Sequence, residues 1–338
     1  MNGFRFTDEE HLEFLSHQGQ LTDIMKQLVF GEDESLIDSL DFDDDRFFQS
    51  PALYSFFNFP GDKPRLADFL KSHWPYCSEM GNFSLVKEHW PFFRFAFEAD
   101  NGVMAEDVDV ASVVGQMAKP IALALKYISE KLPVLDKRIR DTVQWIVPFS
   151  SQQMNSFASL SCHGAIFINR DTGNGSLPFL LDDICHQSAH VYFNTFGLAK
   201  PQFFLVDPDT QVRDACFNGE GVDTRALYTV LHANFTYTQI LEALHALATD
   251  QQQLSSHKEA LARIGFYHEK FRYDLGLLTE NGVDLLSEKG GEICLRMGDF
   301  LQESKLKFPT QFTYATQPYN FSLEAFKQEN SLGEVSVG

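Results

Sequence analysis

Two histidines four residues apart are the side chains of this sequence best placed to do chemistry. His186 and His190 lie in the segment DDICHQSAHVYF. On an α-helix this spacing stacks both imidazoles on one face, where they can bind one metal ion. Chance alone gives roughly 0.36 such pairs in a chain with this histidine content. The spacing therefore predicts a metal site but is also explained by two unrelated helix histidines.

The residue between the histidines decides which chemistry a metal would support. Zinc peptidases carry H-E-x-x-H, in which the glutamate acts as general base. Here that position is Gln187, and an amide cannot take a proton from a metal-bound water, so ordinary zinc-peptidase hydrolysis is disfavoured. Oxidation at iron needs no base there. Three protein ligands with open positions suit Fe(II), O2 and an organic cosubstrate.

A third ligand is expected from a second helix, predicted over Asp223–Leu247. His232 lies seven residues after Arg225, nearly two turns on, so both side chains would share one face about 10 Å apart. An anionic cosubstrate could chelate iron at one end and pair with Arg225 at the other. The structural alternatives are a buried, hydrogen-bonded His232 and an Arg225 that is either solvated at the surface or held in a helix-end salt bridge.

Other residues remain candidates for the third ligand, namely Glu242, Asp214 and Asp223. His245 lies 13 residues after His232, roughly 140° around a helix, so the two are not expected to face one metal ion.

The elements that must position these residues are mostly helical. The pattern predicts a mainly α fold with a small β element, a helical metalloenzyme core built around the His-x-x-x-His helix. The predicted strands are 142–149 and 164–169. The predicted helices are 110–132 (with Pro120 inside), 177–196, 223–247, 252–278 and 283–304.

The chain is expected to have three parts. Residues 1–100 form an aromatic-rich segment of helices and loops, residues 101–310 the catalytic metal-binding domain, and residues 311–338 an irregular tail. Thr7 and Glu10 have the spacing of a capping box, which predicts a helix start. Lys87–Asp100 is dense in aromatic residues and is predicted as a strand or a packed loop. The first part either lines a peptide groove or braces the catalytic domain.

Charge and composition narrow the classes of partner. Lys and Arg total 27 against 47 Asp and Glu, a net charge of −20, which disfavours nucleic acid and anionic membranes as partners. No apolar run is long enough to span a membrane, and the N-terminus does not resemble a secretory signal. Five cysteines without a CxxC motif predict free thiols in a reducing cytoplasm.

Three motifs in order carry a family resemblance: SCHGAIFIN, DDICHQSAH and DTRALYTVLHANF. Over roughly residues 140 to 305 the chain resembles the HExxH-motif peptide-modification proteins found beside ribosomally made peptides. The family comprises iron- and α-ketoglutarate-dependent peptide β-hydroxylases. The resemblance implies iron ligands at His186, His190 and His232, α-ketoglutarate at Arg225, O2 as co-reactant and a precursor peptide as substrate.

The chain departs from this family at Gln187, where the motif has glutamate. Either the glutamate is not essential to hydroxylation, or this is a degenerate copy; the three other matching positions favour activity. Two alternatives remain, a zinc metallopeptidase-like protein of altered mechanism and a non-catalytic peptide-binding protein.

Overall fold

The computed structural model describes most of the chain. The described residues are 3–36, 40–41, 43–59, 61–72, 74–98, 101–102, 104, 107–173, 175–215, 222–279, 285–318 and 320–330. Two compact units emerge from the contacts. The helical unit comprises residues 1–5, 176–186 and 199–338, and the sheet unit comprises residues 6–175 and 187–198. These units interleave along the chain, so their limits do not coincide with those of the three predicted parts.

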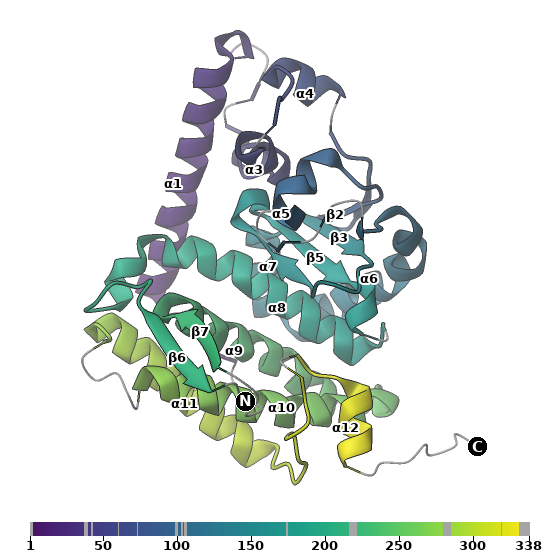
Figure 1. Ribbon diagram of the computed structural model, residues 1–338, viewed down its shortest axis with the longest axis vertical. Coiled ribbons are helices and arrows are strands. Elements are labelled where there is room, and N and C mark those ends of the chain that lie inside the picture. The colour runs from purple at the N-terminus through teal and green to yellow at the C-terminus, as the bar shows by residue number, and fades with distance from the viewer. Residues whose placement is uncertain are drawn as a thin grey trace. The chain divides into compact units, whose positions relative to one another are not determined.

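A mixed five-stranded sheet organises the sheet unit (Figure 1). Its order is β1 (Cys77–Met80), β2 (Phe83–Val86), β3 (Trp145–Phe149), β5 (Ala165–Asn169) and β4 (Phe157–Ala158). β3 and β5 run parallel, and every residue of both is buried, as expected of strands covered on both faces. The strands predicted at 142–149 and 164–169 are confirmed.

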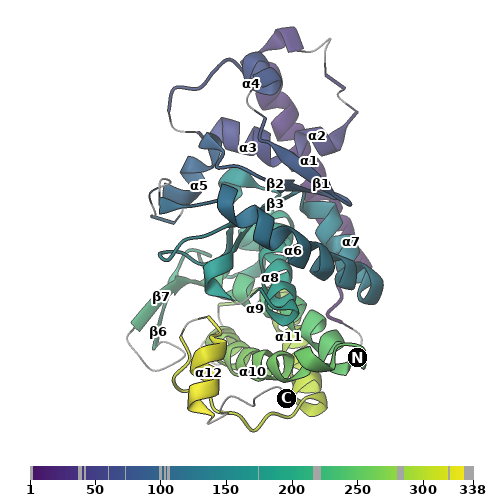
Figure 2. The ribbon, with the colours of Figure 1, turned by 90° about the vertical axis from the view of Figure 1, so that its right-hand side faces the viewer.

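The helices of the sheet unit follow its sequence signals. Helix α1 (Asp8–Glu32) begins at the predicted capping box, with both hydrogen bonds between Thr7 and Glu10 present. Helix α6 (Ala111–Lys131) matches the predicted helix 110–132 and lies along β3 (Figure 2). The remaining helices are α2 (Asp45–Phe48), α3 (Pro51–Asn58), α4 (Leu66–Ser72), α5 (Arg94–Glu98) and α7 (Pro133–Thr142).

The prediction for Lys87–Asp100 is wrong, because Pro91–Glu98 is helical. A 3-10 turn over Pro91–Phe93 leads directly into α5. Pro91 suits the first position of a helical turn, and Arg94 pairs with Glu98 one turn later at 2.7 Å. The aromatic residues that suggested a strand are core side chains of the sheet unit: the ring of Phe93 lies 5.1 Å from that of Phe167 on β5.

Three long helices form the body of the helical unit: α9 (Leu227–Thr249), α10 (His257–Thr279) and α11 (Glu288–Lys307). Helix α10 packs against both of the others. The helices predicted at 252–278 and 283–304 are thus present and start about five residues later than expected. In the segment predicted as an irregular tail, Ser322 caps a short helix, α12 (Leu323–Glu329).

A glycine on α10 allows one close approach. A Cβ added to Gly265 would collide with the hydroxyl of Tyr314, which itself donates to the carbonyl of Ala262 at 2.9 Å. The chain after α11 can therefore pack tightly on α10 only because residue 265 has no side chain.

Two further observations concern the whole described chain. None of its helices in the described ranges is both long and apolar enough to cross a membrane. Cys77, Cys162, Cys185 and Cys294 are free thiols, as predicted, whereas Cys216 lies outside the described residues.

Candidate functional site

Helix α8 (Leu177–Phe196) carries the histidine pair and has the predicted bounds. Ser176 caps it, since its Oγ accepts from the backbone N–H of Phe179 at 3.3 Å. His186 and His190 lie one turn apart, which puts both imidazoles on one face of α8. Both side chains are half-buried. The helix therefore sets two imidazoles one turn apart on a single face.

His190 is held in the form that binds metals. Although part of its surface is open to solvent, burial of the ring lowers the pKa of His190 to about 4. A histidine binds a metal ion through its neutral imidazole. Because His190 is neutral at pH 7, a metal ion would not have to displace a proton from a charged ring. Gln187, the next residue after His186, is buried at 2% exposure. It has no carboxylate with which to act as a base.

A charged cluster that the sequence analysis missed anchors this helix within the helical unit. Asp182 lies four residues before His186 and so on the same face. Its carboxylate accepts from Arg263 Nη1 at 2.8 Å and from the Tyr267 hydroxyl at 2.7 Å. Arg263 also pairs with Glu259 at 2.9 Å. Burial raises the pKa of Asp182, and the charge of Arg263 and the bond from Tyr267 oppose this rise.

The Asp182 cluster is nearly closed to water. The side chains of Asp182 and Arg263 are 6% and 5% exposed. Since a buried ion pair is stable only when its remaining polar groups are also bonded, the cluster fixes α8 against α10. The local signals were the Glu259–Arg263 spacing of four and the Asp182–Asp183 pair. Asp182 and Arg263 lie 81 residues apart in the sequence, so no local pattern indicates that they are in contact.

His232 lies in the second turn of α9 and is buried at 9% exposure. Its ring packs at 5.8 Å from that of Tyr228, one turn earlier. Among the residues that the structure describes, no group of three or more His, Cys, Asp and Glu side chains is arranged to hold a metal ion. The fit to iron is therefore partial: α8 offers two ligands in register, and the described residues complete no three-ligand set.

Glu242, one of the alternative third ligands, acts electrostatically on a residue of α8. After burial, the negative charges of Glu242 and Asp182 raise the pKa of the Cys185 thiol well above its usual range. Glu242 thus acts on the residue directly before His186. The side chains of Asp214 and Asp223 lie outside the described parts of the chain.

The prediction that Arg225 shares a helix face with His232 is wrong. Arg225 lies in strand β7 (Val222–Ala226), and α9 begins only at Leu227. β7 pairs antiparallel with β6 (Gln211–Ala215), in a register that sets Val212 opposite Arg225. The hydrogen bonds between β6 and β7 pair backbone N–H and C=O groups that would otherwise need partners within a turn of helix.

Arg225 is paired with a carboxylate on α10. Its Nη2 and Nη1 donate to Asp274 Oδ1 and Oδ2 at 2.6 and 3.1 Å, a bidentate fork. The Tyr237 hydroxyl donates to the same carboxylate at 2.7 Å. Asp274 is 1% exposed and the Arg225 side chain 11%. The salt bridge considered as a structural alternative for Arg225 is therefore present, inside the protein rather than at its surface.

His245 is likewise engaged within the helical unit. Its Nε2 lies 2.7 Å from the Ser304 hydroxyl, which lies 2.5 Å from His268 Nε2. Burial lowers the pKa of His245 to about 3 and that of His268 to about 4. Both rings are thus neutral and locked to one serine.

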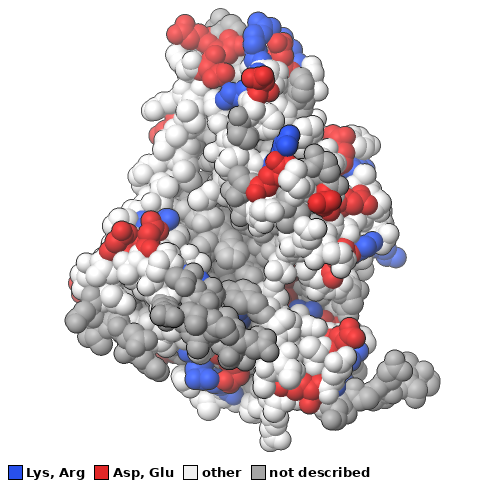
Figure 3. Space-filling view, viewed as in Figure 1, with Lys and Arg blue, Asp and Glu red and all other residues white. Residues whose placement is uncertain are grey.

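The charged side chains on the face drawn in Figure 3 are of both signs and intermingled. The described residues of that face form no basic stripe of the kind that binds phosphates. Neither a protein-family model nor a curated protein matches this sequence.

Proposed function

We propose that this protein is an Fe(II)/α-ketoglutarate-dependent oxygenase that hydroxylates, at a β-carbon, a residue of a ribosomally made precursor peptide in the cytoplasm. The observation that carries the proposal is the pair His186 and His190, one turn apart on a helix that Asp182 ties to α10. When bound, iron with α-ketoglutarate and O2 would supply the oxidation of an unreactive C–H bond.

The residues of the chain would divide the work as follows. His186 and His190 would hold the iron, with His232 as the proposed third ligand and Glu242 as its competitor. Gln187 would leave the centre without an adjacent base, which suits oxidation better than hydrolysis. The Asp182 cluster would keep the histidine-bearing face of α8 in place when the metal binds.

Arg225 is proposed to meet the distal carboxylate of α-ketoglutarate. Because Asp274 already holds two of its N–H groups, the cosubstrate would have to share this guanidinium or displace the carboxylate. This makes Arg225 the part of the proposal most open to test.

A second candidate function, a non-catalytic peptide-binding protein, is favoured by two observations. Arg225 is neutralised by Asp274, and no three-ligand group occurs within the described ranges. On this hypothesis the two histidines of α8 serve the fold alone.

Metal analysis separates these functions. We expect the purified protein to bind one equivalent of Fe(II) and to consume O2 only with α-ketoglutarate and the peptide encoded beside its gene, with one oxygen atom added to the peptide. His186→Ala and His190→Ala should each abolish iron binding, whereas His11→Ala, an exposed histidine on α1, should not. Zinc alone would favour the metallopeptidase-like alternative, and no bound metal would favour the peptide-binding protein.

The third ligand is tested by a matched pair of variants. His232→Ala should lose iron and Glu242→Gln should keep it. The reverse result would move the third ligand to Glu242, and retention of full iron in His186→Ala would refute the site itself.

A further inference from the structure

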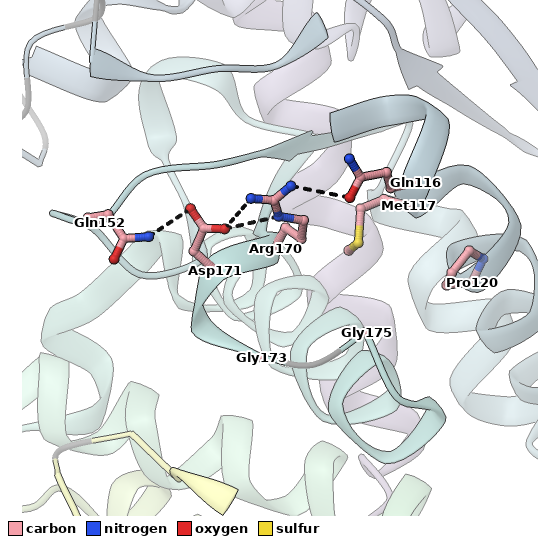
Figure 4. Close-up of a pocket in the computed structure, with 8 residues that line it drawn as sticks. All are labelled: Gln116, Met117, Pro120, Gln152, Arg170, Asp171, Gly173 and Gly175. Atoms are coloured by element: carbon pink, nitrogen blue, oxygen red, sulfur yellow. Dashed lines mark hydrogen bonds and ion pairs between the residues drawn. The ribbon is translucent and has the colours of Figure 1, made fainter. Parts of the chain in front are cut away.

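A cavity of about 450 Å³ opens in the sheet unit, where β3 and β5 end (Figure 4). Its walls are the α6 residues Gln116, Met117 and Pro120 and the loop residues Gln152, Arg170 and Asp171. In sheets with parallel strands, ligands bind beyond the carboxyl ends of the strands. The volume is within the range of small-ligand pockets. The cavity lies apart from the residues of the proposed iron site in the sequence.

The loops that carry its polar side chains are fixed by one buried asparagine. Asn169 is 0% exposed, and its Nδ2 donates to the carbonyls of Ser151 and Met154, both at 2.7 Å. Its Oδ1 accepts from the backbone N–H of Ser151 at 3.3 Å and of Asp171 at 2.9 Å. The chain after β3 and the chain after β5 are thereby joined, so the cavity is formed before any ligand arrives.

The charges within the cavity cancel. Asp171 Oδ1 accepts from Arg170 Nη2 at 2.7 Å and Nε at 3.0 Å. Its Oδ2 accepts from the Ser150 hydroxyl and from Gln152 Nε2, the latter at 3.1 Å. A full anion would add net negative charge beside this satisfied pair, in a chain of charge −20. The cavity therefore favours a neutral polar ligand over an anionic one.

The cavity wall still offers both hydrogen-bond donors and a hydrogen-bond acceptor to a ligand. A guanidinium has five N–H donors; two of those on Arg170 point to Asp171 and one to Gln116 Oε1, at 3.2 Å. The other two can donate to a ligand carbonyl. Gln152 uses its Nε2 on Asp171, which leaves its exposed Oε1 as an acceptor.

A proline inside α6 removes the usual hydrogen-bond donor of one backbone carbonyl. Pro120 has no N–H, so it cannot donate to the carbonyl of Gln116 four residues earlier. This carbonyl belongs to a residue of the cavity wall. Beside it, Met117 and Pro120 supply apolar surface. N–H donors, carbonyl acceptors and an apolar patch, without net charge, are complementary to a peptide main chain carrying one apolar side chain.

We propose that this cavity binds a short, uncharged peptide segment, with a ligand carbonyl on Arg170 and a ligand N–H on Gln152 or on the carbonyl of Gln116. The apolar side chain of the segment lies against Met117 and Pro120. The cavity uses none of the residues proposed to hold iron.

The test is an NMR titration of the full-length, isotope-labelled protein with N-acetyl-leucine N-methylamide. We expect saturable shifts of the Gln116 and Gln152 side-chain amides. Gln152→Ala should weaken binding at least threefold, and Gln20→Ala, an exposed glutamine on α1, should leave it unchanged.

Pro120→Ala is the sharpest variant, because it restores an N–H for the carbonyl of Gln116. The variant should unfold at the same or a higher temperature and yet bind the blocked peptide at least threefold more weakly, so misfolding cannot explain the loss. Absence of saturable binding, or equal affinity in wild type, Gln152→Ala and Pro120→Ala, would overturn the proposal. Tighter binding of N-acetyl-leucine as its free carboxylate would overturn it in favour of an anion site.

Discussion

Removing the guanidinium of Arg225 should damage the fold of the helical unit before it affects any ligand. In Arg225→Ala the carboxylate of Asp274 loses both bonds of its fork and keeps the bond from the Tyr237 hydroxyl. At 1% exposure water cannot replace the lost donors without opening the structure.

The expected cost follows from this burial. Breaking a buried ion pair by removing one partner costs about 3–5 kcal/mol, because the other charge stays behind. An exposed pair would cost about 1 kcal/mol or less. The double variant Arg225→Met/Asp274→Leu removes both charges and keeps most of the volume. It should therefore be less destabilised than the sum of its two single variants, with a coupling energy of about 2 kcal/mol or more.

Urea unfolding at pH 7, followed by circular dichroism, measures these differences for the wild type and four variants, namely Arg225→Ala, Arg225→Met, Asp274→Leu and the double variant. Thermal shift with and without α-ketoglutarate, on the same proteins, tests the cosubstrate role of Arg225 separately. A loss below about 1 kcal/mol in Arg225→Ala, with additive single effects, would refute the structural argument. It would mean that the guanidinium is free for the cosubstrate.

Three further outcomes are expected. Gln187→Glu should keep iron, and peptide oxidation should persist within about tenfold, roughly 1.4 kcal/mol in barrier; a zinc-dependent peptidase activity would contradict the oxygenase. Burial lowers the pKa of His163 to about 4 from 6.5, so below pH 6.5 the unfolded chain takes up a proton that the folded one refuses. The contribution of His163 to the unfolding free energy should thus fall by up to about 3 kcal/mol from pH 6.5 to 4, with no such effect above pH 6.5. His163→Phe should therefore reduce the slope of this part of a urea-unfolding pH series, to which His190, His245 and His268 also contribute; an unchanged slope would contradict the assignment. Gly265→Ala should destabilise by about 1–3 kcal/mol through the clash with Tyr314, whereas Gly291→Ala on α11, where a new Cβ meets nothing, should be neutral or stabilising; equal melting temperatures for the two variants would argue against the close approach.

Local sequence patterns predicted the elements that are marked by the spacing of their own residues. The bounds of α8 were predicted because its apolar residues recur at helical spacing and a glycine-rich turn precedes it. The start of α9 was missed because the four residues before it pair with β6, and a hairpin partner across an intervening loop leaves no periodic signal. Lys87–Asp100 was misjudged because aromatic density is common to strands and to short core helices.

The same distinction applies to the candidate site. The spacing of His186 and His190 is a property of one helix and could be predicted. The partners of Asp182 and Arg225 come from α10, and only the fold brings them into contact. The sequence predicted that Arg225 would pair with the carboxylate of a bound cosubstrate. In the structure Arg225 pairs with the carboxylate of Asp274, a residue of the same chain.

The buried ion pairs of the helical unit also bear on how its stability varies with temperature. Unfolding exposes the charged groups of Asp182, Arg263 and Asp274, and hydration of polar surface lowers the heat capacity change, whereas apolar exposure raises it. The aromatic core of the sheet unit is apolar, so its exposure on unfolding raises the heat capacity change. The hydration of charged groups also becomes less favourable on heating, so buried pairs cost less when hot. Replacing these buried pairs by apolar residues should therefore make the stability curve of the helical unit more sharply domed, with greater weakening in the cold.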